Sequence, residues 1–372
     1  AAMACSDPVQ PDPPPIAMGT VIAASNHTCG LTESGEALCW GNNADGQLGD
    51  GTDVLRMWPV AVSTELRFVD LALGLRHSCG LTASGAVYCW GANGFGQLGD
   101  GTTEPRRQPT PLASLLVFEH IVAGHLHTCG IANDQSAHCW GFNGTGALGD
   151  GTQESRSVPT PGESTLDFTD LAAGAGHTCG LADGGAIHCW GQNSSGELGV
   201  GEYPGSTPPG PAFLTTPAPV ASNMKFVAVS SASSHSCAIA VDGSAHCWGA
   251  NSASQLGDGT SDLRPAPVPV SGEVAFAAVA AGTEHTCALA SDGIAHCWGR
   301  NENGAVGDRT NIERATPVPV AGAHRFRAIA SYQHTCGIAL DTTVLCWGRN
   351  NLGQLGTANL TNSHTPVEVR RR

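Results

Sequence analysis

Short segments of alternating apolar and polar residues run along the whole chain and predict β-strands. Between residues 66 and 101 this period-two pattern covers Phe68–Ala72, His77–Thr82 and Ala86–Gly91. The loop 83–85 between the last two segments ends in glycine, which accepts a left-handed backbone, and it predicts a hairpin with a bulge. An apolar segment with a proline, 59–62, predicts a fourth strand at a sheet edge, where an N–H group need not be paired.

This pattern recurs seven times in the 372 residues. Each unit contains His-Thr-Cys-Gly-Leu or a close variant, followed by Cys-Trp-Gly. The tryptophans are spaced by 50, 50, 50, 58, 50 and 49 residues, at Trp40, Trp90, Trp140, Trp190, Trp248, Trp298 and Trp347. A period near 50 with several short strands per unit predicts a repeat architecture in one closed domain. Features present in all units are best explained by the fold, so function is sought where the units differ.

The ends of the repeat predict how the ring closes. Segment 365–369 repeats the proline-containing strand after the last unit, whereas the first unit begins at Val21 without that strand. We therefore expect an all-β, seven-bladed β-propeller with four strands per blade, in which the C-terminal strand completes the first blade. The predicted organisation is a proline-rich leader at 1–17, the propeller at 18–369 and a basic tail at 370–372.

Each unit also carries two cysteines ten residues apart. If Thr82 faces Ala86 across the hairpin loop, Cys79 faces Cys89 in a non-hydrogen-bonded pair, with Cα atoms about 4.5 Å apart. This separation is at the short end of the range for a disulfide. Seven disulfides imply an oxidising compartment; a row of zinc thiolates is the alternative, although close Cys-x₂-Cys pairs are missing. The predicted pairs are Cys29 with Cys39, Cys79 with Cys89, Cys129 with Cys139, Cys179 with Cys189, Cys237 with Cys247, Cys287 with Cys297, and Cys336 with Cys346.

The fifteenth cysteine, Cys5, follows small residues and precedes a proline-rich stretch at 8–15. This arrangement looks like the processing site of a bacterial lipoprotein, so Cys5 is a candidate lipidation site. A spare thiol in the leader is the alternative, because Ala2 stands where such sites usually have leucine. We expect a secreted, periplasmic or cell-surface protein, including an outer-membrane lipoprotein, with any membrane attachment through this lipid.

Charge narrows the range of partners. The formal net charge is −15 and the only basic run is 370–372, so a nucleic-acid backbone would be repelled. No apolar stretch approaches the roughly 20 residues that span a bilayer. The expected partner is therefore a protein or a surface glycan, and the oligomeric state stays open.

Segments 71–81 and 90–99, and their counterparts in the other units, resemble the repeat of the regulator of chromosome condensation family. The resemblance covers about residues 18–369 and implies a seven-bladed propeller. The cysteine pair replaces apolar residues of the usual repeat and is similar to bacterial, secreted members. Activities within this family vary, so the fold alone does not assign one.

Two activities of the family do not fit this chain. The namesake is a nucleotide exchange factor for a nuclear GTPase, a partner that an exported acidic protein would not meet. The plant ultraviolet-B photoreceptor has Trp-Arg before the repeated histidine, and none of the seven dipeptides here contains tryptophan. The secreted β-lactamase inhibitory propeller is similar in fold and compartment, which implies a rim that fills a cleft of another protein.

Two sets of histidines are candidate metal ligands or bases. One histidine precedes the first cysteine of every pair, which favours a structural hydrogen bond to a neighbouring loop; these are His27, His77, His127, His177, His235, His285 and His334. A second set precedes the second cysteine in only four units, and a metal band around the ring is its functional alternative; these are His138, His188, His246 and His296. No Ser-His-Asp or Cys-His pairing stands out. The Asn-x-x-Gly-Gln-Leu-Gly-Asp-Gly-Thr segments predict turns. A calcium loop is the alternative, although the alternating aspartates and terminal glutamate of a dedicated calcium loop are missing.

Departures from the repeat identify candidate binding residues. The fourth interval has eight extra residues, around 200–213, in a loop that bears Tyr203 and Phe213. Other non-repeated residues that we expect near one face are Phe95, Phe142, Arg76, Arg300, Tyr332 and Arg349. The alternative for these six is ordinary surface variation.

Together these patterns predict an extracytoplasmic propeller that binds a macromolecule through its non-repeated loops, without catalysis, cofactor or metal. The alternatives are a structural subunit of a surface layer or fibre, a secreted enzyme inhibitor similar to the β-lactamase inhibitory propeller, and a metal-dependent enzyme.

Overall fold

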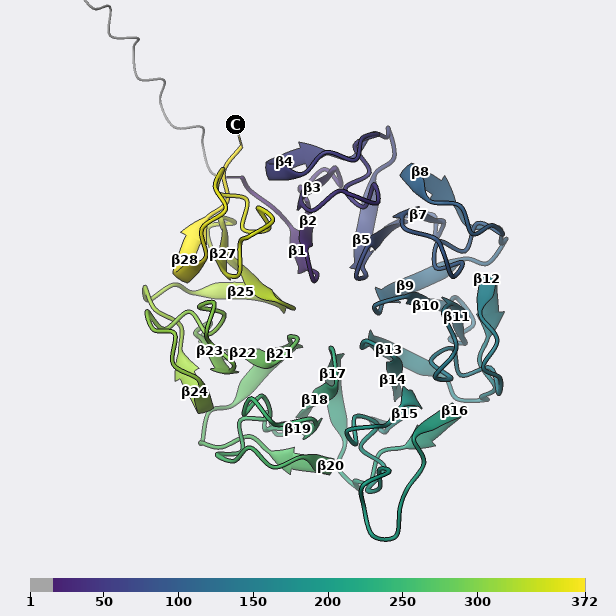
Figure 1. Cartoon of the computed structure of the whole chain (residues 1–372), viewed down its shortest axis with the longest axis vertical. Coiled ribbons are helices and arrows are strands. Elements are labelled where there is room, and N and C mark those ends of the chain that lie inside the picture. Colours follow the sequence, from purple (N-terminus) through teal and green to yellow (C-terminus); the bar gives the residue numbers. More distant parts are fainter. Residues whose placement is uncertain (1–15, 372) are drawn as a thin grey trace, which may run out of the picture.

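Each unit folds into one antiparallel sheet whose four strands lie side by side in chain order. In the second blade these are β5 (Phe68–Leu73), β6 (His77–Thr82), β7 (Val87–Gly91) and β8 (Arg106–Pro111). The computed structural model describes residues 16–371, in which seven such sheets surround a central channel (Figure 1). The first strand of each blade lines the channel and the fourth lies at the rim, which confirms the predicted seven-bladed propeller.

The remaining blades have the same order of strands. They are β1 (Thr20–Ala23), β2 (His27–Leu31), β3 (Ala37–Gly41) and β4 (Arg56–Ala61); β9 (Phe118–Ala123), β10 (His127–Ala132), β11 (Ala137–Gly141) and β12 (Arg156–Pro161); β13 (Phe168–Ala173), β14 (His177–Ala182), β15 (Ile187–Gln192) and β16 (Phe213–Pro219); β17 (Phe226–Ser231), β18 (His235–Ala240), β19 (Ala245–Gly249) and β20 (Arg264–Pro269); β21 (Phe276–Ala281), β22 (His285–Ala290), β23 (Ala295–Gly299) and β24 (Arg314–Pro319); β25 (Phe326–Ser331), β26 (His334–Ala339), β27 (Val344–Gly348) and β28 (Ser363–Glu368). No helix among residues 16–371 is long and apolar enough to cross a membrane.

The predicted ring closure is wrong. The C-terminal strand β28 pairs with β27 of the seventh blade, through Cys346↔Val367, and the first blade is completed by its own β4, through Cys39↔Val60. The proline-containing strand therefore ends a blade and does not begin the next one. The repeat period does not show at which strand a unit begins. The long loop after β3 brings β4 back beside β3, so the outer strand pairs with the strand that precedes it in the chain.

Contacts between the last and first blades close the ring. Ile16 and Met18 are buried in the same apolar cluster as Trp40 of the first blade and Ile338 of the seventh. Ala17 forms an isolated bridge with Thr343 of the seventh blade. The N-terminal end of the described chain thus packs against both blades.

The apolar core lies between blades, not within them. One cluster combines Leu31 and Cys39 of the first blade with Phe68 and Trp90 of the second. Seven clusters of this kind are present, and the one that contains Trp40 joins the seventh blade to the first. Because a single blade cannot bury its apolar faces alone, the units are stable only as a stack of neighbours.

The seven predicted disulfides are all present, each within one blade. Thr82 donates its N–H to the Ala86 carbonyl at 2.9 Å, so the register is the predicted one and Cys79 lies directly opposite Cys89. The bonded pairs are Cys29 with Cys39, Cys79 with Cys89, Cys129 with Cys139, Cys179 with Cys189, Cys237 with Cys247, Cys287 with Cys297, and Cys336 with Cys346.

The separation expected for these cysteine pairs is slightly too long. The Cα atoms of all seven pairs, including Cys139, Cys189, Cys247 and Cys297 with their partners, are 4.0–4.1 Å apart. An ordinary non-hydrogen-bonded pair has about 4.5 Å between its Cα atoms. The difference has a simple physical reason, because a covalent bond between facing side chains draws two strands closer than van der Waals contact does. Cys5 lies outside the described residues, as does nearly all of the predicted leader.

The first set of histidines forms a closed circuit of hydrogen bonds around the ring. Each Nε2 lies 2.6–2.9 Å from the serine or threonine hydroxyl that follows the repeated histidine of the next blade, from His27 with Ser78 to His334 with Thr28. The predicted structural role is confirmed, but the partner is a strand hydroxyl and not a loop.

A second contact joins each repeated tryptophan to the preceding blade. Trp90 Nε1 and the Ser78 hydroxyl both donate to the carbonyl of Gln47, at 2.9 and 2.8 Å. Because that hydroxyl donates to the carbonyl, it accepts the Nε2–H of His27, which fixes the histidine tautomer. The same contact between Trp40 and the Gln354 carbonyl, at 2.9 Å, joins the last blade to the first.

The loop between the third and fourth strands is held by its own side chains. In the second blade Asn93 Nδ2 donates to Asp100 Oδ1 at 3.1 Å, and Arg106 Nε donates to Asp100 Oδ2 at 2.8 Å. Burial opposes ionisation of Asp100, but hydrogen bonds from Thr102 and Arg106 outweigh it and lower the pKa of this carboxyl. Both carboxylate oxygens are thus occupied by the loop itself, as the predicted turn requires.

Candidate functional site

Two kinds of connection open onto the same end of the propeller, which we call the loop face. In the second blade they are residues 74–76, between β5 and β6, and residues 92–105, between β7 and β8. Because neighbouring strands are antiparallel, β5 and β7 end on the same side of the ring. The opposite side, here called the hairpin face, carries the short β6–β7 turn and the link to the next blade.

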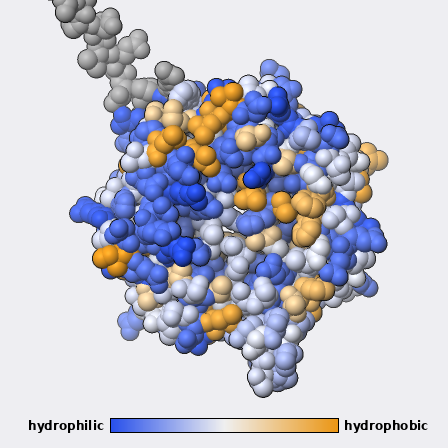
Figure 2. All heavy atoms as spheres, in the orientation of Figure 1, coloured by the Kyte–Doolittle hydropathy of each residue, from blue (hydrophilic) through white to orange (hydrophobic). Residues whose placement is uncertain are grey.

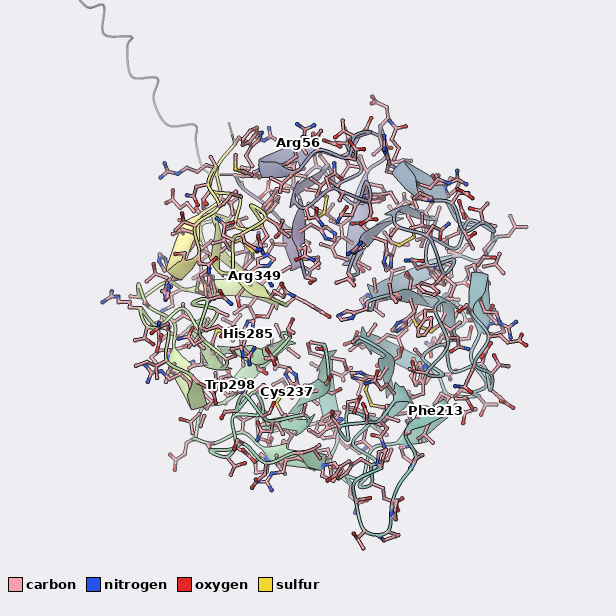
Figure 3. All side chains as sticks on the ribbon, viewed as in Figure 1. Arg56, Phe213, Cys237, His285, Trp298 and Arg349 are labelled. Carbon is pink, nitrogen blue, oxygen red and sulfur yellow. A yellow bond between two sulfur atoms is a disulfide. The ribbon has the colours of Figure 1, made fainter. Side chains whose placement is uncertain are left out.

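All eight candidate binding residues lie at the loop face. Arg76 and Tyr332 are in connections between first and second strands, while Phe95, Phe142, Tyr203, Arg300 and Arg349 are in connections between third and fourth strands. Phe213 is the first residue of β16, where the long connection of the fourth blade ends (Figure 3). The structure divides seven of these residues among three separate places, and Arg76 lies apart from them.

The first place is an aromatic pair on the second and third blades. The rings of Phe95 and Phe142 meet edge to face with centroids 5.0 Å apart, and Phe95 is 42% exposed. Viewed down the ring axis, the surface is mostly hydrophilic with small, separated hydrophobic areas (Figure 2). An exposed aromatic pair on a rigid ring is a suitable anchor for a protein partner.

The second place is the loop of the fourth blade, which projects outward at the rim (Figure 1). The Tyr203 carbonyl accepts backbone N–H groups of Ser206 and Gly210, both at 2.9 Å, so the loop is folded on itself. Tyr203 is half-buried against this loop, whereas Phe213 at its end is exposed. These two residues belong to the fourth blade, which is the neighbour of the third blade that carries Phe142.

The third place is a pocket between the sixth and seventh blades, with a volume of about 120 Å³. We call it the blade 6–7 pocket; its lining includes Glu284, His285, Arg300, Glu302, Tyr332 and Arg349. Arg300 Nη1 lies 2.6 Å from the Glu284 carboxylate and 3.7 Å from that of Glu302. Three of the predicted residues therefore meet here, with two glutamates that sequence reasoning did not select.

Arg76 is not part of any of these groups. It lies at the loop face beside Asp45, with Nη1 3.5 Å from the carboxylate, and its side chain is more than half exposed. A surface ion pair of this kind contributes little to stability.

The channel contains polar groups that the sequence analysis missed. His120 lies between two carboxylates, with Nδ1 3.2 Å from Asp70 and Nε2 3.4 Å from Asp170. Burial lowers the pKa of His120, but the hydrogen bond with Asp70 and the charges of both aspartates outweigh it and raise the pKa. Burial raises the pKa of Asp170. Alignment of the units would have shown the signal, because Ala228, Ala278 and Ala328 occupy this position elsewhere.

A second pair spans the channel near the loop face. The Tyr332 hydroxyl forms a hydrogen bond with His125 Nε2 of the third blade. Burial raises the pKa of Tyr332 and lowers that of His125, so both groups are neutral near pH 7. The channel that contains these two groups of polar residues has a volume of about 330 Å³. Its other lining residues are mainly small and aliphatic residues of the first strands.

The second set of histidines does not form a common site. His138 and His246 stack edge to face on Phe118 and Phe226 of their own blades, and each is close to a serine hydroxyl. Burial lowers the pKa of all four histidines of this set. Within residues 16–371 there is no group of three His, Cys, Asp or Glu side chains arranged to hold a metal ion.

The sequence matches models of a known family of repeats. The model of the RCC1-like domain matches residues 6–275, and models of the regulator of chromosome condensation (RCC1) repeat match residues 276–305 and 341–371. Comparison with curated proteins gives no significant match.

Similar solved structures include Prp20p from Saccharomyces cerevisiae, described with its binding to Gsp1p and histones. It is 19% identical, with a TM-score of 0.80 over 92% of this chain and 87% of that chain. Human WBSCR16 is 18% identical, with a TM-score of 0.75 over 85% of this chain and 84% of that one.

The ectodomain of the receptor kinase ACR4 from Arabidopsis thaliana is also similar. It is 20% identical, with a TM-score of 0.58 over 89% of this chain and 97% of that chain. At these identities the solved structures bear on the fold alone, whereas the family models cover well over half of the sequence. Seven blades, their repeated tryptophans and these matches together show that the chain belongs to the RCC1-like propeller family.

Proposed function

We propose that this protein is an extracytoplasmic binding propeller that recognises another protein through its loop face and has no catalytic activity of its own. The observation that carries the proposal is that repeated and non-repeated residues lie in different parts of the molecule. The repeated histidines, tryptophans and cysteines join strands and blades, whereas all eight non-repeated candidates lie at the loop face.

Two further observations support this function. Seven disulfides are consistent with an oxidising, extracytoplasmic compartment. Prp20p, a protein of the same fold, is described as binding Gsp1p and histones, and the ACR4 propeller is a receptor ectodomain. A rigid ring with variable loops on one face is a general platform for recognition.

The aromatic pair and the rim loop are the proposed contact sites. Phe95 and Phe142 offer apolar area that is already held in place by the ring, so little conformational entropy is lost on binding. Phe213 adds a second exposed aromatic residue at the rim. A partner that covers both would lie across the second to fourth blades.

The test is capture of a partner from the source's culture medium and envelope, followed by purification of a stoichiometric complex with one identified protein. Phe95→Ser with Phe142→Ser, and Tyr203→Ala with Phe213→Ala, should each weaken capture at least about tenfold, as expected for loss of an anchor residue. Thermal stability should stay unchanged, because these side chains lie outside the core clusters.

Leu115→Ser is the matched control, since Leu115 is a fully exposed apolar residue on the hairpin face. Loss of capture in this control would place the contact on the hairpin face. Unchanged capture in both aromatic variants would contradict the proposal. Uniform oligomers of the chain alone, measured by native mass spectrometry, would favour a structural subunit instead.

A further inference from the structure

The blade 6–7 pocket has a cation without an anionic partner. Arg349 donates Nη1–H to Gln333 Oε1 at 2.6 Å and Nε–H to Asn351 Oδ1 at 2.8 Å, both neutral amide oxygens. No carboxylate of residues 16–371 lies within ion-pair distance of this guanidinium. A planar guanidinium that donates only to neutral amide oxygens is well suited to bind a carboxylate ligand.

The same pocket has acceptors without donors. His285 is 3% exposed, and its Nε2 carries the proton because it meets Thr335 Oγ1, which itself donates to the Ala305 carbonyl. Nδ1 of His285 therefore holds a lone pair, and the Nδ1 atoms of five other repeated histidines are likewise without a partner. Thr283 Oγ1 is also buried without a partner. Both residues line the cavity.

The glutamates complete the acceptor side. Arg300 is held close to Glu284 at 2.6 Å, which leaves Glu302 with only a distant cation at 3.7 Å. The charges of the two arginines and two glutamates of the pocket sum to zero. Arg349 has no carboxylate partner, and Glu302, whose side chain is 65% exposed, is free to contact a ligand at the mouth of the pocket. A ligand with both charges would satisfy both residues, whereas an anion or a cation alone would satisfy only one.

These charges are specific to this part of the ring. The residue after Cys-Trp-Gly is Arg300 in the sixth unit and Arg349 in the seventh, and it is Asn42, Ala92, Phe142, Gln192 and Ala250 in the other units. Figure 3 shows Arg349 and His285 on the same side of the ring, from adjacent blades. Repetition of the fold therefore does not account for the two arginines of this pocket.

We propose that the blade 6–7 pocket binds a free α-amino acid in its zwitterionic form. Its carboxylate accepts hydrogen bonds from Arg349, and its ammonium donates to His285 Nδ1, Thr283 Oγ1 and Glu302. The cavity of about 120 Å³ admits a ligand of few heavy atoms and so selects a small side chain, as in glycine or alanine. This site is separate from the proposed macromolecular contact and does not depend on it.

The test is titration of the intact protein with glycine, glycolate and methylamine, followed by calorimetry. Glycine should bind saturably, while glycolate, which lacks the ammonium, and methylamine, which lacks the carboxylate, should each bind at least about tenfold more weakly. Arg349→Met and Glu302→Gln should each weaken glycine binding by a similar factor. Both side chains are accessible from the loop face, so the variants should fold.

Arg76→Met is the matched control, because it removes an arginine from the same face without touching the pocket. Substitution of His285 is avoided, since it would break the circuit between blades. The proposal is overturned if neither glycine nor alanine binds saturably, if glycolate binds as tightly as glycine, or if Arg349→Met leaves glycine binding unchanged. None of these results depends on whether a protein partner is captured.

Discussion

At the scale of single residues, the circuit of histidines and hydroxyls explains why the repeat keeps serine or threonine after the histidine. Thr128→Val preserves shape but removes the acceptor for His77 Nε2–H, a bond of 2.9 Å between buried groups. An unsatisfied buried donor costs about 1–3 kcal/mol, so the free energy of unfolding in urea should fall by that amount. Thr103→Val, at an exposed loop position, is the control and should change it by less than about 0.5 kcal/mol. Equal effects of the two variants would contradict the role of the circuit.

Residue pairs within one hairpin were predictable, and residues that meet across the ring were not. The Cys79–Cys89 pair follows from loop length and register alone, because both cysteines belong to adjacent strands. The contact of Tyr332 with His125 and the placement of His120 between Asp70 and Asp170 depend on how blades are arranged around the channel. Spacing within a unit carries no information on those distances, so the glutamates of the blade 6–7 pocket were missed as well.

At the scale of strands, the error in ring closure has a measurable consequence. Val367 of β28 faces Cys346 of β27 and packs into the cluster between the last and first blades. Val367→Asp should therefore speed amide hydrogen exchange first in β27 and β26, because an unpaired charge is placed against an apolar cluster. The strands β2 and β3 should keep more of their protection, because the outer strand that pairs with β3 is β4 and not β28.

The opposite order of exchange would restore the arrangement in which the C-terminal strand completes the first blade. Val60→Asp in β4 is the matched variant, since Val60 faces Cys39 in the same register, and it should affect β3 first. The number and type of strands were predictable from alternation and turn residues. Their grouping into blades was not, because the same outer strand fits either neighbour until the long loop has been placed.

At the scale of the whole molecule, the seven repeated histidines make stability dependent on pH. Burial lowers the pKa of each to about 3 or about 4, against 6.5 for the unfolded chain. A group whose pKa is lower in the folded state stabilises the fold above its unfolded pKa. That contribution is lost as pH falls below 6.5 toward the folded value. His120, Asp170 and Glu197, whose pKa values are raised in the folded state, act in the opposite direction, but they are three groups against seven.

Unfolding below pH 6.5 should therefore take up several protons at once. For each histidine, the free energy of unfolding falls by about 1.4 kcal/mol per pH unit as the pH decreases from the pKa of the unfolded chain to the lowered pKa of the folded chain. The free energy of unfolding in urea should be nearly constant from pH 8 to 7 and fall steeply from about pH 6 to 5, a range in which ordinary aspartates stay ionised. Proton uptake on unfolding, measured by calorimetry in buffers of different ionisation enthalpy, should exceed three at pH 5. A flat profile down to pH 5 would mean that the histidines are protonated in the folded ring, and the hydrogen bonds that close it would then have to differ from those described.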